Sequence, residues 1–484
     1  MPRNIKSISN PKLKLEILTP EEVRKIHDAT LWIIEKVGVR FPSEHSLDIW
    51  EQHGAQVDRQ TKIVKAKAEL IESALKTCPP EYLLAARDPQ QDLSLDGNHV
   101  YVGTDGCGVE VIDIQTGQRR TSRLQDVADI ARIADGTEEV AFHWVPVSAQ
   151  DTPVETRGLH EIKAIWENST KHVQTESIYK AREAQAAIEM AALIVGGKAA
   201  LRERPVLSLM QCTAPPLGHD AGSLDAALLA AEAGIPTGFM TMAACLTTGP
   251  ATMAGNLAVG NAEVISGTAL LQLAHPGAPV FYAAAQTASD LRSGAYTGGG
   301  PEDFLFGAAT NVLSDFYDIP LSMGSFATGA KEPNWQAGLE NSLSTFMASI
   351  VMSDMLLGVG FLHGSRIWSF AEMMMDCEIF SIIHKTMQGI EVNEETLALD
   401  TIAAVGPCGN FLTQKHTRQH MRDLFLPQFM DRRPYNEWET RKDDARDWAL
   451  AKARRVLAEH QPEPLDAKIS QEMDRIIASV EPVH

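Results

Sequence analysis

Hydrophobic residues in this chain fall into short unbroken runs, which alternate with longer segments where they recur every three or four positions. Unbroken runs are typical of strands buried on both faces, and the wider spacing indicates helices that bury one face. The predicted strands are Val100–Thr104, Val140–Val147, His172–Thr175, Val206–Gln211, Thr237–Thr241, Val280–Ala284, Leu321–Gly324 and Leu356–Phe361. The predicted helices are Leu124–Ala134, Leu159–Glu167, Ala181–Val195, Ser223–Ala233, Ala254–Leu273, Pro301–Asp315, Gln336–Ser353 and Phe370–Gln388.

Signals for helix ends support this assignment. Ser369 and Glu372 have the spacing of a capping box at the start of the last helix, and Gly389 follows its end. The helix predicted at Gln336–Ser353 is amphipathic, because four of its apolar residues fall on one helical face. Those residues are Leu339, Leu343, Phe346 and Ile350.

Eight strand–helix alternations between residues 99 and 389 predict a (β/α)₈ barrel, the TIM barrel. A doubly wound open sheet is the alternative, but no Gly-x-Gly-x-x-Gly turn follows any predicted strand. Residues 1–98 form an N-terminal αβ extension packed on the barrel, with a capping box at Thr19–Glu22. Residues 390–484 form a C-terminal helical extension that wraps the barrel or makes a dimer contact, and we expect a homo-oligomer.

Composition narrows the class of partner. The chain of 484 residues has a formal net charge of −20, whereas nucleic acid and anionic membranes both require a basic face. The six cysteines include no Cys-x-x-Cys pair, which indicates reduced thiols, and residues 1–14 lack the apolar core of a secretion signal. The charge-poor segment Gly234–Ser289 is interrupted by prolines and suits buried barrel elements better than a membrane span. We expect a cytoplasmic protein.

In such a barrel the functional residues lie at or just after the carboxyl end of each strand. This rule gives a polar mouth with few charges, composed of Asp105–Cys107, Ser148–Asp151, Glu176, Ser177, Cys212, Thr213, Met242, Gln286, Ser325, Phe326 and His363. Cys107 could act as a nucleophile or be a small buried thiol. His416 and His420 have metal-ligand spacing but no third ligand nearby, so we expect no metal site.

Several aromatic residues fall near this mouth, and aromatic faces attract quaternary ammonium groups. They are Tyr101, Trp144, Tyr282, Tyr296, Phe326, Phe361 and Trp368. His363 and Arg366 share one loop, where the arginine could hold a carboxylate. Alternatively, the loop is solvated and carries a surface salt bridge. Glu263 lies in an apolar helix, so a buried carboxylate there is either paired or functional.

Longer motifs resemble one known family. The segments Asn261–Val264, Gln272–Ala278, Ala330–Glu340 and Met387–Ala398, with Asn410–Leu412 and Asp431–Arg432, are similar to the trimethylamine methyltransferase family nearly end to end. The resemblance implies a TIM barrel and methyl transfer from an amine to the Co(I) of a corrinoid (cob(I)alamin) on a partner protein.

One difference from that family bears on the substrate. Relatives that act on trimethylamine carry pyrrolysine in the loop matching Ser325–Lys331, where this chain has Phe326 or Ala327. The resemblance therefore implies a member without pyrrolysine that acts on a quaternary amine, whose nitrogen is already cationic. Glycine betaine, giving dimethylglycine, is the first expectation. Proline betaine or carnitine, a non-catalytic betaine-binding barrel and a tertiary-amine enzyme are the alternatives.

The expected partners are therefore a cognate corrinoid protein and a small quaternary amine, with no nucleic acid and no membrane. The step requires no general acid or base, so we expect binding residues only. They are His363, Arg366, Phe361, Trp368, Phe326, Tyr101, Tyr282, Gln286 and Glu263.

Overall fold

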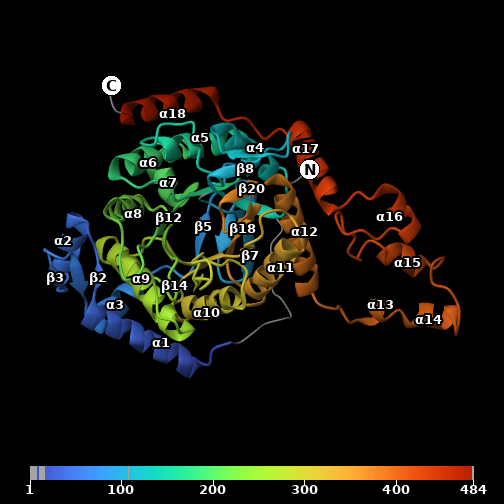
Figure 1. Cartoon of the computed structure of the whole chain (residues 1–484), viewed down its shortest axis with the longest axis horizontal. Coiled ribbons are helices and arrows are strands. Elements are labelled where there is room, and N and C mark those ends of the chain that lie inside the picture. The colour runs from blue at the N-terminus through green and yellow to red at the C-terminus, as the bar shows by residue number, and fades with distance from the viewer. Residues whose placement is uncertain (1–7, 10–16, 107, 482–484) are drawn as a thin grey trace.

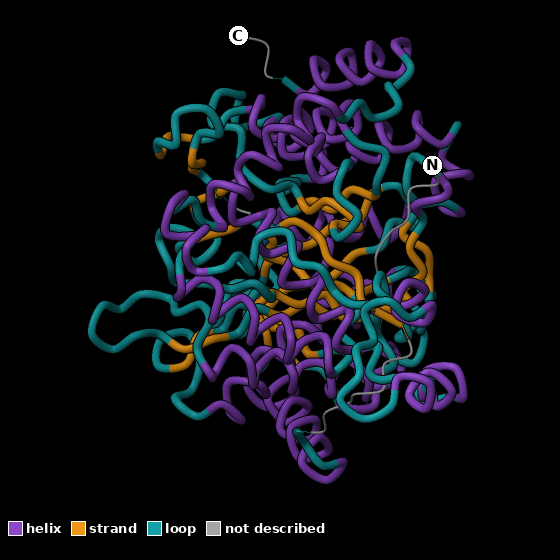
Figure 2. The backbone as a smooth tube through the Cα atoms, turned by 90° about the vertical axis from the view of Figure 1, so that its right-hand side faces the viewer, coloured by secondary structure: helices purple, strands orange, loops and turns teal. Residues whose placement is uncertain are grey.

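A closed barrel of eight parallel strands forms the centre of the protein, here in a computed structural model that describes residues 8–9, 17–106 and 108–481. The helices surround the strands (Figures 1 and 2). The barrel strands are β7 (His99–Thr104), β10 (Val140–Trp144), β11 (His172–Thr175), β12 (Leu207–Cys212), β13 (Thr237–Thr241), β15 (Val280–Ala284), β17 (Leu321–Gly324) and β18 (Met355–Val359). Each pairs in parallel with the next, and β18 pairs back with β7. The predicted TIM barrel is therefore confirmed.

The outer helices follow the strands in alternation. They are α4 (Leu124–Asp135), α5 (Arg157–Asn168), α6 (Ala181–Val195), α7 (Lys198–Glu203), α8 (Ala221–Ala233), α9 (Met253–Ala274), α10 (Pro301–Tyr317), α11 (Trp335–Ile350) and α12 (Phe370–Met387). Ser369 caps α12 by accepting a hydrogen bond from the Glu372 N–H, as its sequence predicts. Helix α9 is long and apolar enough to cross a membrane, but it is almost entirely buried within the protein, as core helices are.

The segment before the barrel packs against α9 and closes one barrel end. Its elements are β1 (Ile8–Ser9), α1 (Pro20–Trp32), a π-helical turn (Ile33–Val37), β2 (Val39–Arg40), α2 (Glu44–Gln52), β3 (Gln56–Asp58), β4 (Ile63–Lys65), α3 (Ala68–Leu75), β5 (Tyr82–Leu84), a 3₁₀ turn (Pro89–Gln91) and β6 (Leu93–Leu95). Helices α1, α2 and α3 contact α9. Leu84, Leu93 and Leu95 of the β5–β6 hairpin pack on Tyr101 and Met355. Because these two residues lie near the amino ends of their strands, the opposite end is the mouth.

Short strands in the connecting loops shape this mouth. They are β8 (Glu110–Ile112), β9 (Arg119–Thr121), β14 (Ala244–Cys245), β16 (Thr287–Ala288), β19 (Phe361–Leu362) and β20 (Ile367–Ser369). Strands β19, β20, β8 and β9 form one sheet, which joins the loops that follow β7 and β18. Phe361 therefore belongs to this loop sheet and not to the eighth barrel strand, which ends at Val359 because Gly358 and Gly360 have positive φ angles.

The chain after the barrel forms two different structures. Helices α13 (Glu394–Leu397), α14 (Leu399–Val405), α15 (Lys415–His420) and α16 (Tyr435–Arg441) project away from the barrel (Figure 1). Helices α17 (Ala445–Glu459) and α18 (Ala467–Val480) return to it, α17 against α12 and α4, and α18 against α5 and α6.

Candidate functional site

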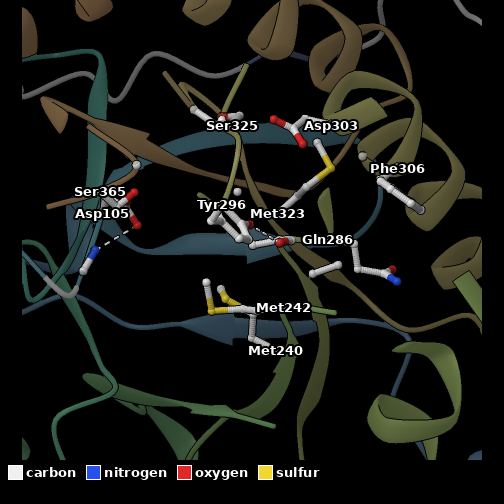
Figure 3. A pocket seen from close by; sticks show the side chains of 18 of the residues that line it. Asp105, Met240, Met242, Gln286, Tyr296, Asp303, Phe306, Met323, Ser325 and Ser365 are labelled. Atoms are coloured by element: carbon white, nitrogen blue, oxygen red, sulfur yellow. Dashed lines mark hydrogen bonds between the residues drawn. The ribbon is translucent and has the colours of Figure 1, made fainter. Parts of the chain in front are cut away.

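A cavity of about 390 Å³ lies at the carboxyl ends of the barrel strands. The strand ends contribute Asp105 and Gly106 after β7, Trp144 on β10, Cys212 on β12, Met240 and Met242 at β13, Gln286 after β15, and Met323 and Ser325 at β17. The loop after β18 adds Gly364–Arg366, the segment before α10 adds Tyr296, and α10 itself adds Asp303 and Phe306 (Figure 3). The volume is within the usual range for small-molecule sites.

Aromatic rings and thioethers form most of the cavity wall. Trp144 and Phe306 are otherwise buried, whereas Tyr296 is 41% exposed because its ring faces the cavity. The Tyr296 hydroxyl donates a hydrogen bond to the carbonyl oxygen of Ala285, which holds the ring in place. The sulfur atoms of Met240, Met242 and Met323 lie around it (Figure 3). Such a wall is polarisable and offers ring faces that attract cations.

Two carboxylates interrupt this apolar wall. Asp303, in the first turn of α10, accepts hydrogen bonds from the Thr287 hydroxyl and from the Gly300 N–H at 3.2 Å. Burial nevertheless raises the pKa of Asp303 to about 7. Asp105 accepts hydrogen bonds from the Ser365 hydroxyl and from the Gly106 N–H at 2.9 Å, and burial raises its pKa to about 6.

The two carboxylates act on the same tyrosine. Although the ring is partly exposed to the cavity, desolvation of the hydroxyl group is the main cause of the raised pKa of Tyr296, and the charges of Asp303 and Asp105 add to it. Burial and nearby carboxylates likewise raise the pKa of the Cys212 thiol to about 12, so this cysteine is protonated at neutral pH. A cation bound beside Tyr296 would favour the ionised form of both aspartates. The interior of the cavity thus holds two carboxyl groups whose ionisation would respond to a bound cation.

One cationic side chain lines the opening. Arg366 is exposed, and its loop is held from both sides. Ser365 ties the loop to Asp105, while the N–H groups of His363 and Gly364 donate to the carbonyl oxygens of Ala330 and Thr328 at 2.7 and 2.9 Å. The loops after β7, β17 and β18 therefore meet at this point of the cavity wall.

Of the nine residues expected to bind substrate, the structure places Gln286 and Arg366 in the cavity wall. Gln286 is buried and its Nε2 donates to the Asn256 carbonyl oxygen at 2.8 Å. His363 is the immediate neighbour of the lining residue Gly364 but does not itself line the cavity. Burial, with the charges of Lys331 and Arg366, lowers its pKa, which favours the neutral ring.

The other six expected residues lie away from the cavity, and their contacts explain why. Tyr101 is at the closed end of the barrel, packed with the β5–β6 hairpin. Tyr282 points outward from β15, where its hydroxyl donates to Asn261 Oδ1 of α9 at 3.2 Å, because alternate strand residues face opposite sides. Phe361 and Trp368 pack edge to face at 5.2 Å inside the loop sheet, and Phe326 is buried in the loop after β17.

The buried Glu263 carboxylate is fully hydrogen-bonded to neighbouring parts of the fold. Its Oε2 accepts hydrogen bonds from the hydroxyls of Thr213 and Thr241 at 2.6 and 2.8 Å, and its Oε1 accepts one from the Leu217 N–H at 2.8 Å. Burial raises its pKa, while these three donors favour the carboxylate. The side chain therefore joins α9 to the loop after β12 and to the end of β13, outside the cavity.

Sequence reasoning did not single out Asp303 and Phe306. Both lie on α10 and not at a strand end, so the strand-end rule passes over them. The available signal is the run Gly298–Gly300 followed by Pro301, which brings the start of α10 over the mouth of the barrel. Cys107, which the same rule did include, lies outside the described residues.

The closed barrel and a cavity at the carboxyl ends of its strands define the class of β/α-barrel enzymes. Comparison with known proteins then gives the family. A model of the family "Trimethylamine methyltransferase (MTTB)" matches residues 1–481. The chain therefore belongs to the trimethylamine methyltransferase family, which confirms the resemblance seen in the sequence, and it is a methyltransferase.

Individual relatives cover almost the whole chain. It is 33% identical over 462 residues to "Trimethylamine methyltransferase MttB" of Desulfitobacterium hafniense (strain DSM 10664 / DCB-2), spanning 95% of this chain and 93% of the relative. It is 34% identical over 468 residues to "Glycine betaine methyltransferase" of Desulfitobacterium hafniense (strain Y51), spanning 96% of this chain and 97% of the relative. A solved structure of Methanosarcina barkeri monomethylamine methyltransferase has a TM-score of 0.50 at 11% identity, covering 96% of this chain and 93% of that one, which supports the fold.

Proposed function

We propose that this protein transfers a methyl group from a quaternary amine, with glycine betaine as the preferred substrate, to the Co(I) of a corrinoid carried by a partner protein. The observation that carries the proposal is the cavity itself. Aromatic rings and thioethers surround its interior, two buried carboxylates favour a positive charge there, and a single arginine lines its opening. A betaine has the complementary arrangement of charges, with a trimethylammonium group at one end and a carboxylate at the other.

The relatives alone do not choose the substrate. One with 33% identity is named for trimethylamine and another with 34% is named for glycine betaine. The loop 325–331 supports glycine betaine. Where trimethylamine enzymes carry pyrrolysine, this loop has Phe326, which is buried, and Ala327, which lies at the cavity wall. A tertiary amine requires activation before it loses a methyl group, whereas a quaternary nitrogen leaves as a neutral tertiary amine.

The residues of this chain would bind, orient and desolvate the substrate. Trp144, Tyr296 and Phe306 enclose the trimethylammonium group, and Asp105 and Asp303 balance its charge. Arg366 holds the carboxylate and so fixes the orientation of the substrate in the cavity. When the bond breaks, its electron pair goes to nitrogen, and dimethylglycine forms without a general acid or base on the protein.

The surface around the mouth fits a methyl acceptor delivered by another protein. Leu246 and Leu291, in the loops after β13 and β15, are exposed apolar side chains near the lining residues Met242 and Tyr296. They would contact the face of a corrin ring. A Co(I) corrinoid supplies a strong nucleophile that accepts the methyl group as a cation equivalent.

The test is to incubate the protein with cob(I)alamin and one amine at a time, and to follow the formation of methylcobalamin in the visible spectrum. Glycine betaine, proline betaine, carnitine and trimethylamine form the panel. We expect conversion with glycine betaine and formation of dimethylglycine. Conversion with trimethylamine but with none of the betaines would refute the proposal, and measurable betaine binding without methyl transfer would indicate a binding protein instead.

A further inference from the structure

The segment 391–441, which we call the arm, exposes an unusual amount of apolar surface. Of the twenty-six large apolar side chains that are exposed in the described part of the chain, twelve lie in the arm, with exposed fractions of 40 to 78%. They are Val392, Leu397, Leu399, Ile402, Phe411, Leu412, Met421, Leu424, Leu426, Met430, Tyr435 and Trp438. Helices α13, α14, α15 and α16, described in full, contain no buried residue. Exposed apolar patches of this extent mark interfaces.

The arm is nevertheless held at its base. The N–H groups of Gln428 and Phe429 donate to the Glu378 carboxylate of α12 at 2.7 and 2.9 Å. Arg433 pairs with Asp443 at 2.6 Å, and its guanidinium lies 4.9 Å from the ring centre of Trp448 on α17. These contacts fix the direction in which the arm projects beyond α12 (Figure 1). The arm is therefore held in a defined position through buried Phe429 and its neighbours, while its twelve exposed apolar side chains are not covered by the described part of the chain.

A second uncovered apolar face belongs to α11. Trp335 is 80% exposed, and Leu339 and Leu343 follow it at intervals of four residues, both more than 40% exposed. The sequence predicts an amphipathic helix with Leu339 and Leu343 on its apolar face, but the barrel side of α11 consists instead of small and polar residues such as Ala337, Asn341 and Ser344. Trp335, Leu339 and Leu343 thus face away from the barrel, whereas Phe346 and Ile350, further along the predicted apolar face, pack against the core. The only charged residue of α11 is Glu340, which accepts hydrogen bonds from Thr328 and Gly329.

The charges of the arm also indicate its partner. Residues 391–400 contain Glu391, Glu394, Glu395 and Asp400 and no Lys or Arg, whereas residues 415–422 contain Lys415, Arg418 and Arg422 and no acid. In a two-fold assembly the acidic part of one arm can lie against the basic part of the other. Such local pairing is needed because each chain carries a net charge of −20, so two copies otherwise repel each other.

We propose that the arm docks on a second copy of this chain and covers the stripe Trp335, Leu339 and Leu343 of that copy, while the second arm does the same in return. Both complementary faces are present in every copy, so a two-fold dimer buries both. The cavity in the barrel centre is not part of this contact, so the proposal is independent of the proposed function.

Sedimentation velocity of the full-length protein at micromolar concentration tests the dimer. We expect the wild-type protein to sediment as a dimer or a multiple of it, and Leu339→Glu with Leu343→Glu to shift it to the monomer. Val154→Glu, at an exposed apolar residue in the loop after β10 and so outside both faces, is the control and should leave the dimer intact. Circular dichroism of each variant verifies folding. A wild-type monomer, or a double variant that remains dimeric, would overturn the proposal.

An experiment that mixes two variants distinguishes docking of the arm on α11 of the other copy from other modes of dimerisation. An arm variant with Leu412→Glu, Leu424→Glu and Leu426→Glu should also be monomeric alone. Mixed with the α11 variant, it retains an intact α11 stripe for the intact arm of its partner, so we expect a heterodimer of intermediate stability. Two folded variants that stay monomeric when mixed would contradict docking of arm on α11, and binding of the arm to a different protein, with a monomeric wild type, would exclude the second copy as its partner.

Discussion

At the residue scale, charge decides what the cavity accepts. Asp105 and Asp303 lie in an apolar wall of rings and thioethers, where burial raises the pKa of each carboxyl group. A protonated carboxyl group contributes little attraction to a cation, whereas an ionised one in the same place contributes much. The affinity for a quaternary ammonium group should therefore depend on pH in a range where ordinary aspartates are already ionised.

Affinity for glycine betaine should fall as the pH is lowered from 8 to 6. The pKa of Asp303 is about 7, so the ionised form that attracts the cation is lost over this interval. For one required carboxylate we expect the dissociation constant to rise about 10-fold, measured by titration calorimetry. Asp303→Asn should bind more weakly at pH 8 and should shift the remaining pH dependence to below about 6, where Asp105 titrates. Glu138→Gln, at an exposed carboxylate that does not line the cavity, is the control and should keep the wild-type profile.

Arg366→Met tests the arginine at the opening. Loss of charge-assisted hydrogen bonds to a carboxylate should raise the KM for glycine betaine about 10- to 100-fold. Binding of choline, which has the same trimethylammonium group and no carboxylate, should change little. Lys331→Met removes another exposed charge from the neighbouring loop and serves as the control. Equal kinetics for Arg366→Met and the wild type would remove this residue from substrate recognition.

At the scale of elements, close backbone contacts join the loops of the mouth. Phe326 has a φ of 47° and Gly358 a φ of 126°, both in the left-handed half of the backbone map. A Cβ atom on Gly358 would lie 1.9 Å from the carbonyl oxygen of Ser325. The end of β18 therefore passes directly against the loop after β17, and only glycine permits this approach.

Gly358→Ala should destabilise the protein by about 3 kcal/mol, because it combines an unfavourable φ with a backbone clash. The urea midpoint of unfolding measures this effect. Gly338→Ala in α11 is the matched control, since the added Cβ atom meets no neighbour within 4 Å and alanine favours a helix. An unchanged midpoint for Gly358→Ala would show that the two loops can separate without cost.

At the scale of the whole molecule, the C-terminal extension has two roles. Helices α17 and α18 complete the helical layer, where Ala449, Ala453, Met473 and Ile477 are buried. The arm between α12 and α17 has no such role within one chain, and we assign it to the interface between copies. The extension thus wraps the barrel through α17 and α18, and the arm is the part that we propose for assembly.

Met473→Ala should lower stability by about 2 to 5 kcal/mol, as expected for a large buried side chain. The residue is fully buried where α18 packs on α5 and α6. Arg475→Ala, on the exposed side of the same helix, should stay within about 0.5 kcal/mol of the wild type. If urea unfolding of both variants matched the wild type, α18 would be a loosely attached segment.

The sequence predicts the positions of the helices and strands well, but it does not predict the direction in which a strand's side chains point. All eight barrel strands occur where the apolar runs predict them, and Arg366 and Gln286 do line the cavity. Tyr101 and Tyr282 are on barrel strands too, but one lies at the closed end and the other faces α9. In a strand buried on both faces the apolar pattern does not distinguish inside from outside, because both faces are equally apolar.

The sequence by itself determined the strand–helix alternation, the barrel and the family, because these depend on local periodicity and on motifs spread over the whole chain. Only the tertiary structure decided which side chains share the cavity. Asp303 and Phe306 reach it from α10, and Asp105 and Arg366 are brought together through Ser365, although some 260 positions separate them in the chain. Such proximity results from closure of the barrel, and no local pattern records it. The same holds for α11, whose apolar stripe is visible in the sequence but whose outward direction is not.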